Sequence, residues 1–181
     1  NETDLHEMKG VVPMREVVIQ TLTRDAFAPF GTYEQMDQPQ GVALTGDLHA
    51  FYPDRMQAPA TGHILGFSTI TVKRPKRMVI EQVEYHTTTW EMIFPLDDDM
   101  ILHVSPPSGG TPSLEHTCAF FVPRQTLVYL RPAVWHLAPL PAEAAQLTAM
   151  IVLPTCTYAN DCTVVTLAPA DRFELIFPTN E

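Results

Sequence analysis

Residues 78–96 read MVIEQVEYHTTTWEMIFPL, two runs rich in β-branched and aromatic residues that meet at the short stretch TTTW. Such runs favour β-strands. Side chains alternate across a strand, so Glu84 and His86 are expected to share a face with Ile80 and Gln82. The stretch therefore predicts a strand pair and also places a carboxylate and an imidazole side by side.

Similar runs recur along the chain, separated by turn-forming stretches, and the sequence contains 17 prolines. Short strands at this spacing indicate an all-β protein, an antiparallel sandwich or barrel. The expected strands are 17–22, 64–73, 78–87, 90–96, 100–105, 117–122, 126–130, 147–153, 161–167 and 173–177.

Two segments have helical character. TRDAFAPFG (23–31) offers Thr23 as an N-cap, an acid in its first turn and Gly31 as a stop. PAEAAQL (141–147) is a weaker candidate. The polar, aperiodic residues 1–15 suggest an N-terminal tail or edge arm, and residues 16–181 are expected to form a single domain.

Composition narrows the class of protein. With 181 residues and 45% hydrophobic content the chain can bury its own core. A net charge of −10 disfavours nucleic-acid or anionic-membrane partners, and no apolar run approaches the ~20 residues of a membrane helix. Three cysteines without zinc spacing predict buried free thiols in a reducing compartment. Without a visible signal-peptide pattern, we expect a cytoplasmic protein.

A metal site would explain the polar residues of the opening stretch. If their strand face lines a barrel interior, an unpaired carboxylate and imidazole would be costly there, whereas a divalent metal binds both. The pattern of Glu84, His86 and Glu91, E-x-H-x4-E, is close to the H-x-H-x3–4-E of metal-binding cupins, and His136 in RPAVWHLAP matches the histidine of a later cupin strand. These four residues would suit Ni, Mn, Fe or Zn.

A solvent-exposed strand face is the competing interpretation of E-x-H, and spacing alone favours it. His136 after an aromatic residue shifts the balance toward the metal without deciding it. His103 could face inward but is more typical of a core or edge histidine, and Cys118 is expected to pack in the interior. The remaining histidines are expected in the tail or on the surface: His6, His49, His63 and His116.

Three longer stretches resemble one family. TLTRDAFAPFGTY (21–33), EYHTTTWEMIFPL (84–96) and SLEHTCAFFVPRQTLVYLRPAVWHLAPLP (113–141) are similar to segments of the ureidoglycolate lyases, cupins of purine and allantoin catabolism. The resemblance covers most of the chain from Ile19 to Leu153. It implies a cupin-type β-barrel (a double-stranded β-helix, or jelly roll), a homodimer, and cleavage of (S)-ureidoglycolate to glyoxylate and urea.

Carried over to this sequence, Glu84, His86 and His136 match pocket positions of that family, and Glu91 stands where glutamine is more common. The chain departs from the family pattern where Leu137 and Arg131 replace histidines and Val72 replaces an arginine. A carboxylate substrate favours a fixed cation, for which the candidates are Arg131, Lys73 and Arg74. Further substrate-binding candidates are Tyr129 and Gln82.

The resulting hypothesis is a metal-assisted lyase acting on a small anionic ureido or hydroxy acid. The metal would chelate carboxylate and hydroxyl, Glu84 or Glu91 would take the hydroxyl proton, and a neighbouring acid, with His136 a candidate, would protonate the departing nitrogen. If both glutamates are ligands, water or another group must be the base. The alternatives are another metal-dependent cupin enzyme (a sugar-acid isomerase, epimerase or oxygenase) and a non-catalytic small-molecule-binding cupin, which Arg131 and Leu137 favour.

Overall fold

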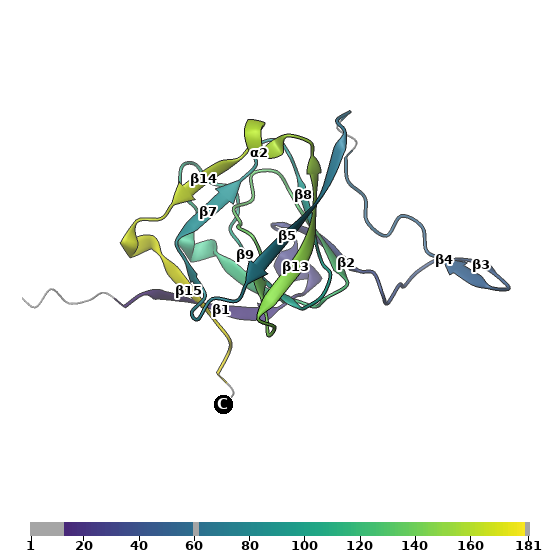
Figure 1. Ribbon diagram of the computed structural model, residues 1–181, viewed down its shortest axis with the longest axis horizontal. Coiled ribbons are helices and arrows are strands. Elements are labelled where there is room, and N and C mark those ends of the chain that lie inside the picture. The colour runs from purple at the N-terminus through teal and green to yellow at the C-terminus, as the bar shows by residue number, and fades with distance from the viewer. Residues whose placement is uncertain (1–12, 60–61, 180–181) are drawn as a thin grey trace, which may run out of the picture.

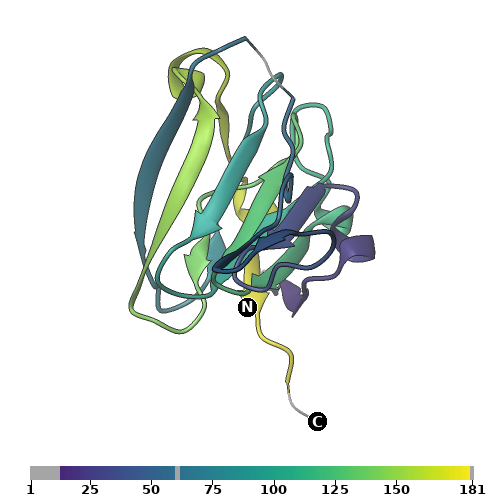
Figure 2. The same cartoon turned by 90° about the vertical axis from the view of Figure 1, so that its right-hand side faces the viewer.

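Two curved β-sheets face each other in the computed structural model, which describes residues 13–59 and 62–179 (Figures 1 and 2). The expected all-β fold with short helices is confirmed. Most of the expected N-terminal tail lies outside the described residues, and its last residue, Arg15, already belongs to the first strand. No helix among the described residues is long and apolar enough to cross a membrane.

The strand order defines the two sheets. The six-stranded sheet runs β12 (Leu140–Pro141), β9 (Met100–Val104), β10 (Cys118–Val122), β1 (Arg15–Thr21), β15 (Phe173–Ile176) and β6 (Val79–Ile80). The five-stranded sheet runs β2 (Gly31–Gln35), β11 (Thr126–Leu130), β8 (Glu91–Pro95), β13 (Gln146–Pro154) and β5 (Leu65–Lys73). Two further pairs are β14 (Thr163–Thr166) with β7 (Gln82–Tyr85), and β3 (Leu44–Gly46) with β4 (His49–Phe51).

Pairing is antiparallel throughout these ladders except at β1, which runs parallel to both β10 and β15. The expected antiparallel barrel therefore needs a correction at this strand. β1 enters the sheet between two strands that come much later in the chain, which is a long-range pairing that a sequence pattern does not reveal.

Alternating burial along the strands builds the barrel interior. In β8, Glu91, Ile93 and Pro95 are buried, whereas Met92 and Phe94 are only half-buried on the opposite face. Ile93 belongs to the main core together with Leu102 of β9 and other apolar side chains from both sheets. Since Glu91 shares the face of Ile93, its carboxylate points into the barrel.

A second apolar cluster lies on the other face of β9 and β10. It includes Ile80, Val83, Ile101 and Trp135, all of them buried. The expected strand 78–87 is broken into two, β6 and β7. Ile80 and Val83 pack in the same cluster although they are three positions apart, which would put them on opposite faces of an unbroken strand. The prediction that Ile80 shares a face with Glu84 is therefore wrong.

The short helices agree only in part with the sequence predictions. Helix α1 (Arg24–Phe27) begins after Thr23, whose Oγ1 accepts a hydrogen bond from the Ala26 amide, as predicted. The predicted helix 141–147 is wrong. Pro141 pairs with Met100 at the sheet edge, and the Asp98 carboxylate accepts the amides of residues 143 and 144, so these groups are satisfied without helical bonds. The other short helices are α2 (Thr157–Asn160), η1 (Leu114–His116) and η2 (Pro169–Asp171).

Candidate metal centre and active site

The stretch from β7 to β8 delivers three of the candidate residues. Glu84 lies in β7, His86 directly follows that strand, and Glu91 opens β8. The fourth, His136, forms an isolated β-bridge with Glu84 through the two backbone hydrogen bonds between them, 2.7 and 2.9 Å long. A further bond of 2.6 Å joins the Ala133 amide to the His86 carbonyl. Two segments about 50 residues apart in the chain are thus locked together by backbone contacts.

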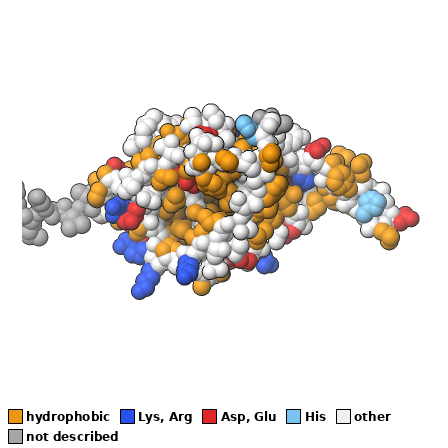
Figure 3. Space-filling model, turned by 45° about the horizontal axis from the view of Figure 1, so that its top comes forward, with side chains coloured by type: hydrophobic (Ala, Val, Ile, Leu, Met, Phe, Trp, Pro, Cys, Tyr) orange, Lys and Arg blue, Asp and Glu red, His pale blue; other side chains and the backbone are white. Residues whose placement is uncertain are grey.

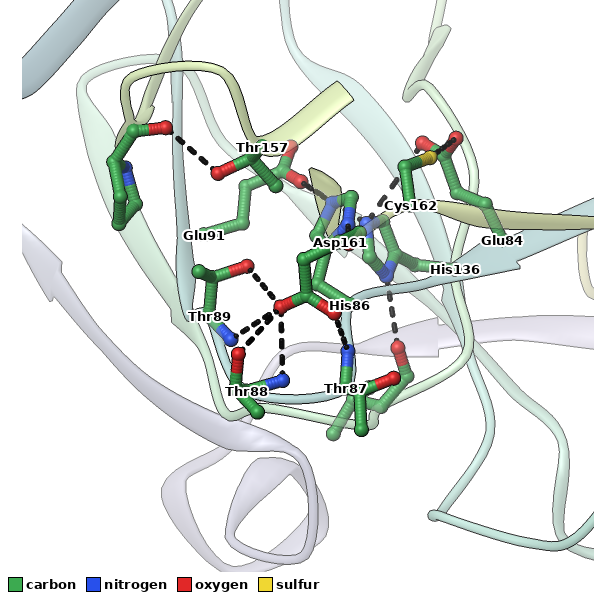
Figure 4. Close-up of polar contacts among 12 residues, drawn as sticks. Glu84, His86, Thr87, Thr88, Thr89, Glu91, His136, Thr157, Asp161 and Cys162 are labelled. Carbon is green, nitrogen blue, oxygen red and sulfur yellow. Dashed lines mark hydrogen bonds and ion pairs between the residues drawn. The ribbon is translucent and has the colours of Figure 1, made fainter. Parts of the chain in front are cut away.

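The four side chains converge (Figure 4). Oε2 of Glu91 lies 3.0 Å from Nε2 of His86 and 3.1 Å from Nε2 of His136. Oε1 of Glu84 lies 3.9 Å from the same nitrogen of His136. His86, Glu91 and His136 are only 2, 6 and 2% exposed, which excludes the solvent-exposed strand face for these three, while Glu84 is half-buried.

The second nitrogen of each imidazole contacts a backbone carbonyl. His86 Nδ1 lies 2.8 Å from the Asp161 carbonyl oxygen, and His136 Nδ1 lies 2.9 Å from that of Val134. A carbonyl oxygen only accepts, so both Nδ1 atoms carry hydrogen. In the neutral rings both Nε2 lone pairs then point at the Glu91 carboxylate. Three lone-pair donors facing one another need a cation among them, either protons or a metal.

The electrostatics of the cluster reflect this arrangement. Burial alone would raise the pKa of Glu91, but the charges and hydrogen bonds of His136 and His86 outweigh it and lower that pKa to about 2. Burial would likewise lower the pKa of His136, yet the Glu91 carboxylate beside it makes the net shift upward. In the metal-free chain Glu91 is therefore an anion stabilised by imidazole protons, the positions that a divalent metal would take over.

Groups from the 157–162 segment lie beside the glutamates. Cys162 donates its thiol hydrogen to Oε2 of Glu84 over 3.5 Å, and burial together with Glu84 raises the pKa of that thiol to about 11. Burial and the charges of Glu91 and Glu84 raise the pKa of Tyr158 to about 12, so its phenol keeps its proton. Sequence reasoning missed both residues, since neither forms part of a recognisable motif.

Asp161 was also missed, because the sequence pattern assigned residue 161 to a strand. The structure starts β14 at Thr163 and leaves Asp161 at the C-terminal end of α2, with its carboxylate on the Thr87–Thr89 loop. The sequence signal that could have pointed to this contact is the run of three threonines. Its N–H and O–H groups are donors that suit a carboxylate partner.

The structure does not place the three substrate-binding candidates in this cluster. Gln82 is exposed and donates to Thr166 of β14. Tyr129 pairs with Met92 on the outer face of the five-stranded sheet and packs against Trp90. Arg131 is exposed, donates to the Ala28 carbonyl, and lines a cavity of about 200 Å³ to which none of the four cluster residues contributes.

The other cation candidates and histidines are also placed. Lys73 and Arg74, at the end of β5, are exposed, and Leu137 is half-buried. His103 is buried against Phe173, and burial followed by the charge of His136 lowers its pKa to about 3, so it is a neutral core histidine. Its Nε2 has no hydrogen-bond partner in the described part of the chain, which differs from the satisfied core residue expected. The surface histidines are exposed as predicted, with His6 outside the described residues: His49, His63 and His116.

The three cysteines are free, as expected, but none of them is fully buried as predicted. Cys156 is exposed, and Cys118 and Cys162 are half-buried. Cys118 packs at the margin of the main core, in agreement with its predicted packing role.

Comparison with known proteins identifies relatives of this chain. The ureidoglycolate lyase family matches residues 14–174. Ureidoglycolate lyases of Pseudomonas savastanoi pv. phaseolicola and Pseudomonas syringae pv. syringae are each 29% identical over 128 residues, which is 68% of this chain and 74% of theirs.

Among solved structures, a Bacillus subtilis oxalate decarboxylase with Mn(II) centres aligns with 57% of this chain at 14% identity and a TM-score of 0.40, and the match spans 24% of that enzyme. RmlC from Streptococcus suis, in complex with dTDP-D-xylose, aligns with 62% of this chain and 60% of its own at 6% identity and a TM-score of 0.39. The family match extends over all four cluster residues, from β1 to β15. This chain is therefore an enzyme that belongs to the ureidoglycolate lyase family.

Proposed function

We propose that the protein is a metal-assisted lyase that cleaves ureidoglycolate to glyoxylate and urea. The observation that carries the metal is the convergence of the two Nε2 atoms and Oε2 of Glu91 in a buried position, with both Nδ1 atoms already bound to carbonyls. Family membership and the activity in the names of the Pseudomonas relatives support the substrate.

The donor set fits a divalent metal. Imidazole nitrogen and carboxylate oxygen bind Zn, Ni, Mn or Fe, and carbonyl-bound Nδ1–H groups are the outer contacts that orient such ligands. His86, His136 and Glu91 would hold the ion. Glu84, His86 and His136 also offer ligand atoms within 4.8 Å of one another, so Glu84 would complete the site or stand beside it. The ion would supply Lewis-acid polarisation of the substrate's carboxylate and hydroxyl oxygens.

Glu84 is the better candidate for the proton transfer. Glu91 is buried between two imidazoles, and its pKa of about 2 makes it a weak base. Glu84 is half-buried, and its carboxylate accepts a hydrogen bond from the protonated Cys162 thiol.

A single carboxylate, that of Glu84, can account for both proton transfers of the reaction. Glu84 takes the proton of the substrate hydroxyl, the C–O bond becomes a carbonyl, and the C–N electron pair leaves with the nitrogen. The carboxylic acid formed on Glu84 then returns its proton to that nitrogen, which gives glyoxylate and urea. Tyr158, held as a phenol near both glutamates, offers a hydrogen-bond donor to the anionic substrate.

Metal content and turnover test this proposal together. Elemental analysis of freshly purified wild type is expected to show close to one metal per chain, and both His86→Ala and His136→Ala are expected to lose metal and ureidoglycolate cleavage. His116→Ala is the matched control, since His116 is exposed and its Nδ1 contacts only Ser113 among the described residues.

Two results would point elsewhere. Failure to bind metal after incubation with Ni, Mn, Fe and Zn would sink the metal hypothesis and leave Glu84 with a metal-free acid–base role. Bound metal without cleavage of ureidoglycolate would favour the second class of cupin enzyme, and iron with oxygen consumption would identify an oxygenase.

A further inference from the structure

The Asp161 carboxylate collects hydrogen bonds from the whole loop that follows His86 (Figure 4). Its Oδ1 accepts from the Thr87 amide at 2.7 Å. Its Oδ2 accepts from the amide and hydroxyl of Thr88, both at 2.9 Å, and from those of Thr89 at 2.9 and 3.0 Å. These five bonds explain why the pKa of Asp161 lies well below its ordinary value, despite partial burial.

The backbone of the same residue contacts His86 itself, because the Asp161 carbonyl oxygen accepts from Nδ1 of that imidazole at 2.8 Å. Asp161 therefore holds the histidine at its ring and, through its side chain, at the three residues that follow it. The two contacts close a small ring of covalent and hydrogen bonds between the 84–91 stretch and the end of α2.

We propose that Asp161 is a positioning residue that fixes the ring orientation and the Nδ1–H form of His86, so that Nε2 faces Glu91. The inference rests on the proposed function for its catalytic consequence, although the positioning itself does not require a metal. The carboxylate tethers the backbone of residue 161 to the Thr87–Thr89 loop, and this tether keeps the carbonyl within reach of Nδ1.

His136 shows why His86 needs this partner. The Nδ1 of His136 bonds to the carbonyl of Val134, two residues earlier in its own segment, so local backbone geometry orients that ring. His86 receives its carbonyl from a residue 75 positions later. The β14–β7 ladder, which begins with Thr163 opposite Tyr85, already holds the two segments together two residues further on. The Asp161 side chain adds a tether at residue 161 itself, to the loop that follows His86.

A graded set of variants separates positioning from general stability. Asp161→Ala removes all five bonds, Asp161→Asn keeps one oxygen acceptor, and the double variant Thr88→Val with Thr89→Val removes only the two hydroxyl donors. Thr157→Val is the matched control, since the buried Thr157 hydroxyl donates to the Pro154 carbonyl in the same segment and makes no hydrogen bond to the loop within the described residues.

The first readout is the Nδ1–H proton of His86 in ¹H–¹⁵N spectra of the metal-free protein. Wild type and Thr157→Val are expected to show it as a slowly exchanging, hydrogen-bonded signal, which Asp161→Ala loses and Asp161→Asn and the double variant weaken. The second readout is Zn²⁺ affinity by chelator competition, expected to fall about 10- to 100-fold in Asp161→Ala and not in Thr157→Val.

The possible failures are distinguishable. If Asp161→Ala keeps the protected Nδ1–H signal, or if Thr157→Val loses it equally at matched thermal stability, the positioning role is overturned. If Asp161→Ala does not fold, the double threonine variant decides on the same two readouts. If wild type binds no Zn²⁺, the proposed metal site fails, while the Nδ1–H signal still tests Asp161.

Discussion

At the residue scale, the charge state of the site depends on Glu91. This side chain accepts from both imidazoles, and its charge is the main cause that raises the pKa of His136 against the effect of burial. A neutral glutamine at this position would change the number of protons, or the metal charge, that the site accommodates.

Glu91→Gln is therefore expected to lower the pKa of His136, because burial would then act on the imidazole with only the weaker effects of Val134 and Glu84 to oppose it. The measurement is an NMR titration of the His136 ring in the metal-free protein. The control is Glu174→Gln, because Glu174 lies on β15 and its carboxylate pairs with Arg77. This variant should leave the titration of His136 unchanged. An equal or higher pKa of His136 in Glu91→Gln would contradict the assignment.

The same pair gives the metal-free protein a defined pH dependence. The pKa of His136 is raised above 6.5, so its contribution to stability is present below that pH and is lost as pH rises through the folded value. The pKa of Glu91 is lowered from 4.5 to about 2, so its contribution is present above 4.5 and is lost as pH falls toward 2. This pair thus stabilises the metal-free fold most between these limits.

Metal binding should follow the opposite trend above pH 6.5, because the ion must displace a proton from His136. Between pH 6 and 8, the melting temperature of the metal-free protein is expected to fall, whereas the stabilisation by added Zn²⁺ is expected to rise. If both the melting temperature and the stabilisation by Zn²⁺ are the same at pH 6 and pH 8, His136 is neither protonated in this range nor a ligand.

The four cluster residues could be predicted from the sequence because they follow a spacing that a strand and its return impose, with one histidine from a later segment. The supporting residues could not. Asp161 and Cys162 approach from more than 70 positions away, and their role depends on how the 157–162 segment crosses the β7–β8 loop. The substrate candidates Gln82, Tyr129 and Arg131 were inferred from residue type alone and stay predictions.

At the element scale, strand existence followed from composition, and most predicted strands match observed ones. The ends of the strands and the interruptions within them could not be predicted from composition. The turn LDDD at residues 96–99 shows why, since its carboxylates accept hydrogen bonds from backbone amides that are distant in the sequence. Asp97 accepts that of Thr148 in β13, Asp98 those of residues 143 and 144, and Asp99 that of Arg124. Residues 141–147 have a helical sequence pattern, but the tertiary hydrogen bonds to Asp98 take up backbone amides that a helix would use.

Asp98→Ala tests that explanation. It leaves the amides of Glu143 and Ala144 to solvent, and removing hydrogen bonds of this kind is expected to lower the free energy of unfolding by about 1 kcal/mol. Urea denaturation measures the change, and Asp171→Ala, at an exposed position, is the control. No loss of stability would mean that the strand pairing of Pro141 alone prevents the helix.

At the scale of the whole molecule, two exposed apolar surfaces remain. The hairpin of β3 and β4 stands away from the barrel (Figure 1), and every residue of its strands is exposed, with Leu48 at its turn 97% exposed. Hydrophobic side chains gather on this arm and on part of the barrel surface (Figure 3). An isolated two-stranded hairpin is marginally stable in water, so this arm calls for a partner surface.

The second surface is a row across the outer face of the five-stranded sheet. Strand register aligns Phe67, Val152, Met92 and Tyr129. Phe67 on the edge strand β5 is 71% exposed, Met92 and Tyr129 are half-buried, and Val152 is buried, so the exposed apolar area of this row is concentrated at Phe67. The arm returns to the barrel at the other end of this row, where Met56 contacts Thr32, the residue paired with Tyr129. Arm and row are therefore continuous surfaces of one chain.

The base of the arm is fixed to the barrel by charge. Arg55 pairs with Glu34 of β2 at 2.7 Å and also donates to the Gln40 carbonyl, so it joins the segments that enter and leave the hairpin. A fixed base gives the arm a set direction relative to the sheet, and this makes a symmetric exchange between two chains geometrically consistent. Each chain would then cover the apolar row of the other.

The homodimer implied by the family resemblance stays a prediction, and these surfaces give it a specific test. We expect light scattering to show a dimer for wild type and a monomer for Leu48→Glu with Phe51→Glu and for Phe67→Glu, because each places charge on an exposed apolar side chain that the proposed dimer would bury. Asp47→Lys, at an exposed polar position on the same arm, is the control and should remain dimeric. A monomeric wild type would leave both surfaces to another partner; a dimer that survives both disruptive variants would place the interface elsewhere on the barrel.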